Sequence, residues 1–156
     1  MLRLIVFAIA TALSVPLWGW QQPSAKPNFS GPWQLDSAKS KAEGKDDLVW
    51  KIDHKGDSFA IDEVSAGKTL SSSKCTIGKP CEFQEDGKKM SAITYFLDMT
   101  LVQIRSAADN SSVIKRQFRM NEDGSLRVEL ITIVPSDKTE TLVFGKQKAP
   151  SDPPKL

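Results

Sequence analysis

The chain has 156 residues, of which 40% are hydrophobic and 26% charged, a composition typical of a single folded domain rather than of a disordered or fibrous protein. Its 21 Lys and Arg nearly balance its 19 Asp and Glu, and the formal net charge is +2. Basic and acidic residues are interspersed, as in Lys55-Gly56-Asp57, so we expect no continuous basic surface and no nucleic-acid partner.

The first twenty residues predict export. Arg3 precedes an apolar run from Leu4 to Leu13, which is the layout of a secretory signal peptide. The run is short for a membrane span of about 20 residues, and Pro16 interrupts it. Residues 1–20 are therefore predicted to be a signal peptide and the protein to be secreted or periplasmic. An uncleaved leader is the alternative, and it is the only membrane contact that we expect.

Two proline-rich segments flank the rest of the chain. Residues 21–27 carry Pro23 and Pro27, which cannot donate to a sheet, and they are predicted to form a linker. Residues 148–156 carry three prolines and are predicted to form a disordered tail. The folded domain is thus predicted over residues 28–147.

The domain is predicted to begin with a strand over Gly31–Leu35. A glycine, one residue and then Trp33 lead into an apolar–polar alternation, which places a bulky side chain beneath the first strand. The residues Asp36–Gly44 mix Ser, Ala, Lys and Glu, and Asp36 or Ser37 could cap a single helical turn. This stretch is predicted to be a short helix or an irregular loop.

From residue 48 onward the sequence alternates with a period of two, which predicts half-buried strands. Lys55-Gly56-Asp57 supplies a tight turn, so the stretches on either side are predicted to form a hairpin. The apolar face of this hairpin comprises Leu48, Trp50, Ile52, His54, Phe59 and Ile61.

Seven further strands follow, separated by turns that contain glycine, proline, Asn or Asp. Within the strand that ends at Met120, Arg116 is an exception, because it falls on the apolar face. The seven predicted strands are Thr69–Cys75, Cys81–Gln84, Met90–Leu97, Leu101–Arg105, Ile114–Met120, Leu126–Val134 and Thr139–Gln147.

Eight to ten short strands without a helix of more than two turns predict an all-β fold. Strands that are neighbours in sequence tend to pair, and a sheet loses its exposed edges when it closes on itself. We therefore predict an antiparallel up-and-down meander closed into a β-barrel. The interior of a barrel of this size is either filled with side chains or holds one small ligand.

The chain has two cysteines, Cys75 and Cys81, separated by a plausible turn. In an oxidising compartment such a pair can form a disulfide. Two separate thiols remain the alternative, because the spacing does not establish that the two sulfur atoms face each other.

The sequence resembles the calycins, which include the lipocalins and fatty-acid-binding proteins, and more specifically small secreted bacterial proteins with a lipocalin-like domain. The resemblance covers roughly residues 28–147. The segments that carry it are Asn28-Phe29-Ser30-Gly31-Pro32-Trp33 with Leu35-Asp36 and Lys39-Ser40, then Ile52-Asp53-His54-Lys55-Gly56-Asp57, Asp123-Gly124-Ser125-Leu126 and Val143-Phe144-Gly145-Lys146.

The resemblance implies a lipocalin-like β-barrel and export, but little chemistry, since most members of this group have no assigned activity. In lipocalins a basic residue near the last strand packs over the first tryptophan, which here matches Lys146 over Trp33. One turn departs from the pattern: Leu97-Asp98-Met99-Thr100 lacks the expected glycine, so we expect a looser hairpin there.

No residue pattern predicts catalysis, a cofactor or a metal site. His54 is the only histidine, and no Gly-x-Ser-x-Gly turn accompanies it, so we interpret it as a strand-end residue beside a turn. Replacing His54 by Ala is expected to leave the fold intact. One His and two Cys cannot complete a zinc site by themselves.

We predict a non-enzymatic, exported protein that binds a small apolar or amphipathic molecule inside its barrel. The alternative is a module of the cell envelope, with a solidly packed barrel, that binds a protein partner which the sequence does not identify. The residues predicted to line a cavity, or else to fill a core, are Trp50, Phe59, Ile61, Phe118, Val128, Leu130 and Phe144.

Overall fold

The computed structural model describes residues 25–41, 44 and 46–147. The predicted signal peptide (1–20), most of the predicted linker and the predicted tail (148–156) lie outside the described residues.

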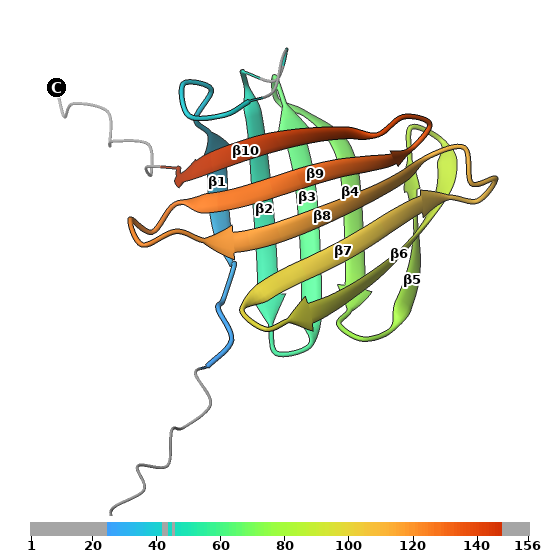
Figure 1. Cartoon of the computed structure of the whole chain (residues 1–156), viewed down its shortest axis with the longest axis horizontal. Helices are drawn as coiled ribbons and strands as arrows, with labels where there is room; N and C mark the ends of the chain where they lie inside the picture. Colours follow the sequence, from blue (N-terminus) through green and yellow to red (C-terminus); the bar gives the residue numbers. More distant parts are fainter. Residues whose placement is uncertain (1–24, 42–43, 45, 148–156) are drawn as a thin grey trace, which may run out of the picture.

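Ten antiparallel strands form one closed barrel, as Figure 1 shows. Each strand pairs with its neighbours in sequence, and the last pairs with the first, so the predicted up-and-down meander is confirmed. The strands are β1 (Gly31–Leu35), β2 (Leu48–Lys55), β3 (Ser58–Ser65), β4 (Lys68–Thr76), β5 (Pro80–Glu85), β6 (Lys88–Leu97), β7 (Thr100–Ala107), β8 (Val113–Met120), β9 (Leu126–Val134) and β10 (Lys138–Lys146).

The barrel closes where β1 lies between β2 and β10. Trp33 is opposite Trp50 on β2 and opposite Lys146 on β10. The Lys146 Nζ atom lies 5.8 Å from the centroid of the Trp33 ring, as the resemblance implied. A cation within about 6 Å of an indole face is attracted to its π electrons, so this contact supports the closure.

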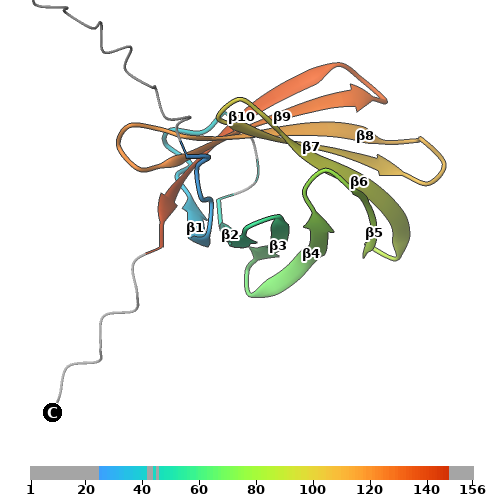
Figure 2. The same ribbon diagram turned by 90° about the horizontal axis from the view of Figure 1, so that it is seen from below.

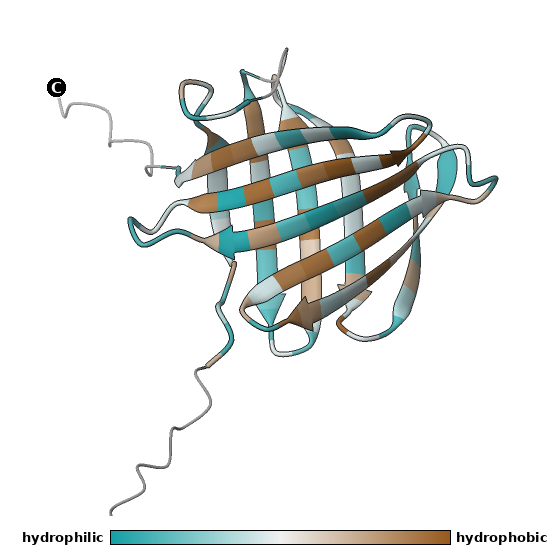
Figure 3. Ribbon diagram, viewed as in Figure 1, coloured by the Kyte–Doolittle hydropathy of each residue, from teal (hydrophilic) through white to brown (hydrophobic). Residues whose placement is uncertain are grey.

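The strands form two curved walls, with β2–β4 running across the direction of β7–β10 (Figures 1 and 2). Apolar and polar residues alternate along most strands, as the banding in Figure 3 shows, and the apolar set faces inward. Burying one large apolar side chain contributes about 1.5–3 kcal/mol, so this inner face is the main source of stability. The core cluster comprises Phe29, Trp33, Leu35, Leu48, Trp50, Ile52, Phe59, Ile61, Leu101, Phe118, Leu126, Val128, Leu130, Leu142 and Phe144.

The contact between β4 and β5 differs from the other strand pairings. Its ladder has one registered pair, Ser71 with Glu85. A disulfide joins Cys75 and Cys81 across the same two strands, with their Cα atoms 5.4 Å apart. The covalent bond therefore links strands that share few backbone hydrogen bonds.

The turn between β6 and β7 is tight although it lacks a glycine. Leu97 pairs directly with Thr100, so only two residues separate the strands, and the expectation of a looser hairpin is wrong. Asp98 adopts a φ of +54° there. Aspartate tolerates this left-handed conformation better than most residues, which explains how the turn forms without glycine.

The described residues that directly follow β1, 36–41, form an irregular loop, one of the two predicted alternatives. The Asp36 carbonyl oxygen accepts hydrogen bonds from the backbone N–H groups of Lys39 and Ser40, which closes a turn and not a helix. Within the described part of the chain, no helix could cross a membrane, and no group of three or more His, Cys, Asp or Glu could hold a metal ion.

Candidate functional site

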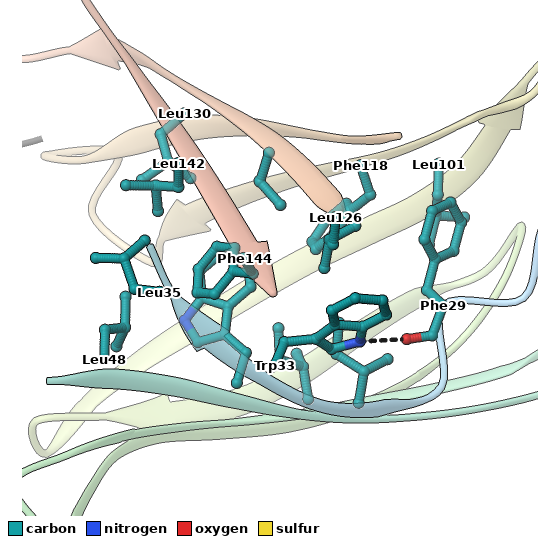
Figure 4. Packing of buried hydrophobic residues seen from close by; sticks show 14 of the residues in the cluster. Phe29, Trp33, Leu35, Leu48, Leu101, Phe118, Leu126, Leu130, Leu142 and Phe144 are labelled. Atoms are coloured by element: carbon teal, nitrogen blue, oxygen red, sulfur yellow. Dashed lines mark hydrogen bonds between the residues drawn. The ribbon is translucent and has the colours of Figure 1, made fainter. Parts of the chain in front are cut away.

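One end of the barrel, which we call the closed end, is filled by the segment that precedes β1. Phe29 is fully buried there, beside Phe118 (ring centroids 6.2 Å apart) and Phe96 (6.4 Å). Trp33 is also fully buried, and its Nε1–H donates a 2.8 Å hydrogen bond to the Phe29 carbonyl oxygen (Figure 4). This end therefore has a packed interior.

His54 holds the same segment in place. The Phe29 backbone N–H donates to its Nδ1 atom at 3.3 Å, which requires that nitrogen to be unprotonated. The Ser30 hydroxyl accepts from the His54 backbone N–H (2.8 Å) and donates to the His54 carbonyl oxygen (2.9 Å). Burial lowers the pKa of His54, and a backbone hydrogen bond at Gly56 opposes this effect only in part. His54 thus has a structural role at the closed end.

Acidification is expected to destabilise the protein through His54. Because the pKa of His54 is lower in the folded chain than its ordinary value of about 6.5, the unfolded chain binds more protons between these values. The contribution of His54 is therefore complete above about pH 6.5 and is lost as the pH falls through the folded pKa. Urea unfolding of the wild type and His54→Ala between pH 7.5 and 5.5 measures this. His54→Ala should fold but lose this pH dependence; an identical dependence in both proteins would contradict the assignment.

A cleft of about 420 Å³ lies outside the closed end. Lys26, Pro27, His54, Asp57 and Phe96 are among the residues that line it. The Lys26 Nζ atom lies 4.5 Å from the centroid of the Phe96 ring. Because this cleft is open to solvent and is lined about equally by polar and apolar groups, it offers little enclosed apolar surface.

The opposite end contains a hollow of about 220 Å³, which we call the interior pocket. It lies where β2, β8, β9 and β10 bring apolar side chains together, and in Figure 4 Leu130 and Leu142 lie at this end, away from Trp33 and Phe29. The residues that line it are Gly44, Leu48, Trp50, Glu63, Ser65, Leu70, Ile114, Arg116, Leu130, Thr132, Glu140 and Leu142.

Two of the seven residues predicted to line a cavity, Trp50 and Leu130, lie at the interior pocket. The other five pack into the solid part of the core. Alternation showed which side chains point inward, but whether inward side chains meet or leave a gap depends on the opposite wall. The five residues in the packed core are Phe59, Ile61, Phe118, Val128 and Phe144.

A buried ionic cluster borders the interior pocket. Arg105 donates from Nη1 to Glu63 Oε1 (3.1 Å) and from Nη2 to Glu85 Oε1 (2.9 Å) and Ser71 Oγ (3.1 Å). Arg116 Nη1 lies 2.7 Å from the same Glu63 oxygen, an ion pair without the alignment of a hydrogen bond. Arg105 and Arg116 are 2% and 6% exposed, so inside the barrel Glu63 is shared by two cations, of which Arg105 also pairs with Glu85.

The cluster keeps Glu63 ionised. Burial by itself raises the pKa of this carboxyl, but Arg116 and Arg105 lower it by more, so the pKa lies below its ordinary value. Burial and the neighbouring Arg116 lower the pKa of Arg105, while Glu63 and Glu85 oppose that change. Each charge in the cluster therefore depends on the others.

Arg116 also faces Trp50. Its guanidinium carbon lies 5.1 Å from the centroid of the Trp50 ring. Among the described residues, neither Trp50 Nε1 nor Arg116 Nε has a hydrogen-bond partner, although both atoms are buried. Buried donors of this kind are uncommon in folded proteins, and a water or a ligand oxygen is the kind of acceptor that satisfies them.

Sequence reasoning identified Arg116 as an inward charge but missed Glu63 and Arg105. The same alternation could have found both, since Glu63 follows Ile61 by two residues and Arg105 follows Leu101 by four. The alternation cannot show that Arg105 and Glu63, which are 42 positions apart in the sequence, form an ion pair across the barrel.

The architecture defines the class of protein: a closed, antiparallel, ten-stranded meander barrel of lipocalin-like fold. No family model matches the sequence, and no curated protein matches it. Among solved structures, a secretary abundant heat soluble (SAHS) protein from Ramazzottius varieornatus matches with a TM-score of 0.65 and 13% identity, over 80% of this chain and 98% of that chain.

A second solved structure, the REP1-NXSQ fatty acid transporter, matches with a TM-score of 0.57 and 19% identity. The match covers 77% of this chain and 96% of that chain. At these identities the likeness establishes a shared fold.

Proposed function

We propose that the protein binds a small apolar or amphipathic molecule in the interior pocket and catalyses no reaction. The hollow of about 220 Å³ inside the barrel is the observation that carries the proposal. Leu48, Leu130 and Leu142 offer an apolar surface there, and Arg116 and Trp50 offer polar contacts. Sites for small molecules typically combine a mainly apolar lining with a few placed polar groups.

The structural neighbours are consistent with this proposal. One of them is named as a fatty acid transporter, and it shares this fold over most of its length. The cavity here is smaller than the ~300–1,000 Å³ typical of sites for drug-sized ligands. The ligand that we propose is therefore correspondingly small. A solidly packed interaction module is less well supported, because the end of the barrel opposite the closed end contains this hollow.

Filling the interior pocket is expected to abolish binding. Isopropylbenzene is the probe, since a cavity of about 150 Å³ can hold benzene and this one is larger. The Leu130→Trp variant places a larger side chain in the hollow and should lose saturable binding measured by calorimetry. Leu97→Trp is the matched control, because Leu97 is 63% exposed at the other end of the barrel. If Leu130→Trp and Leu97→Trp bound isopropylbenzene equally well, the probe would bind outside the interior pocket.

We also infer that the protein is exported, on the basis of the leader in residues 1–20. A periplasmic or secreted location provides the oxidising conditions in which the Cys75–Cys81 disulfide persists. Cell fractionation with mass spectrometry tests this inference: protein recovered outside the cytoplasm without the leader supports it, and full-length protein found only in the cytoplasm contradicts it.

A further inference from the structure

The polar atoms of the interior pocket indicate which chemical group a ligand must present. Trp50 is 1% exposed and Arg116 is 6% exposed, so water reaches neither side chain freely. Their Nε1 and Nε atoms are buried donors without a partner among the described residues. Leaving such a donor unsatisfied costs about 1–3 kcal/mol. The group that completes this site must therefore accept hydrogen bonds.

The charges around the interior pocket are already balanced. Glu63 lies within 2.7 Å of Arg116 and 3.1 Å of Arg105, and Glu85 lies 2.9 Å from Arg105. Glu140, the remaining acidic residue of the lining, has Lys138 Nζ 3.3 Å from its Oε1 atom. Among the described residues that line the interior pocket, a ligand carboxylate would find no uncompensated cation.

A carboxylate in the interior pocket would add a negative charge beside Glu63. Displacing Glu63 from Arg116 would leave Glu63 with Arg105 alone, in a site where it is 12% exposed. Burying a charge without a full partner is costly, since each ion loses several kcal/mol of hydration. A neutral acceptor satisfies the same donors without this cost.

The volume limits the size of the ligand. If about 150 Å³ holds benzene, with its six heavy atoms, then the 220 Å³ here corresponds to about nine non-hydrogen atoms. Resting on the function proposed above, we infer that the ligand is a short, uncharged molecule whose carbonyl or ether oxygen accepts hydrogen bonds from Trp50 and Arg116. A free carboxylic acid is the class that this site disfavours.

Three probes of about nine non-hydrogen atoms each distinguish these classes: acetophenone, benzoate and isopropylbenzene. They share one ring and differ in the group attached to it. Each is titrated at pH 7 into the ¹⁵N-labelled full-length protein, and the indole N–H signals are followed by NMR. Trp33 serves as an internal control because its indole already donates to Phe29, and Trp50→Phe assigns the Trp50 signal by its loss.

Acetophenone is expected to shift the NMR signal of the Trp50 indole N–H proton downfield. Isopropylbenzene has the same ring but no hydrogen-bond acceptor, so it should not cause this downfield shift. Because Trp50→Phe also changes the shape of the pocket for every probe, the informative quantity is the difference: the variant should weaken acetophenone binding roughly three- to tenfold more than it changes isopropylbenzene binding. Benzoate should bind at least about tenfold more weakly than acetophenone.

Each contrary result has a distinct meaning. Benzoate binding as tightly as acetophenone would overturn the inference that the ligand is uncharged. Acetophenone binding without a shift of the Trp50 signal would overturn the assigned hydrogen bond, even if Trp50→Phe proved too unstable to study. Failure of both acetophenone and isopropylbenzene to bind would overturn the proposed function itself, and this inference with it.

Discussion

The Glu63→Gln variant is expected to lose about 3–5 kcal/mol of unfolding free energy, because the substitution leaves two buried guanidinium groups without their shared counterion. Arg105 retains Glu85, whereas in the ion pairs of the described residues Arg116 is paired with Glu63. Urea denaturation followed by fluorescence measures the loss. Burial of both arginines makes this the largest effect that we expect from removing one charge.

The matched control is Glu82→Gln. Glu82 pairs with Lys89 at 3.0 Å, but both side chains are at least 60% exposed. Exposed ion pairs contribute about 0–1 kcal/mol, so this variant should unfold almost like the wild type. Similar small effects in the two variants would mean that the interior cluster is hydrated and contributes little.

Truncating Trp33 to Ala is expected to cost about 3–5 kcal/mol, because it removes the largest side chain of the closed end. The substitution also deletes the hydrogen bond from Nε1 to the Phe29 carbonyl oxygen. Since that hydrogen bond ties the Phe29 backbone to the indole, we expect the segment before β1 to lose protection from hydrogen exchange. Urea denaturation gives the free energy, and exchange mass spectrometry gives the location.

Two variants separate the contributions at this site. Trp33→Phe keeps a ring but loses the donor, so its cost should be smaller than that of Trp33→Ala. Leu97→Ala removes a side chain that is 63% exposed, and surface substitutions of this kind usually stay within about 0.5 kcal/mol. A loss for Trp33→Ala no greater than for Leu97→Ala would show that Trp33 does not hold the closed end together.

The fold could be predicted from the sequence because its signals are local. Alternation identified the strands, and turns such as Lys55-Gly56-Asp57 fixed where the chain reverses. When each short strand pairs with the next one in the sequence, few sheet topologies other than a meander are possible. The β6–β7 turn was misjudged because Asp98 takes a left-handed conformation that is more often occupied by glycine.

The site was harder to predict because it depends on distances across the barrel. Leu130 and Val128 have the same pattern in the sequence, yet one lines the interior pocket and the other packs in the filled core. Arg116 stood out as a charge on an apolar face, but its partner Glu63 lies 53 positions away in the sequence. Only the closed geometry brings the two together.

The most direct test of whether the interior pocket is a binding site is a crystal structure determined from crystals of the protein grown with isopropylbenzene. We expect one probe molecule between Leu48, Leu130 and Leu142, with the Trp33 end of the barrel unchanged. A probe bound only in the cleft beside Lys26, or an interior pocket closed by inward movement of these leucines, would contradict it.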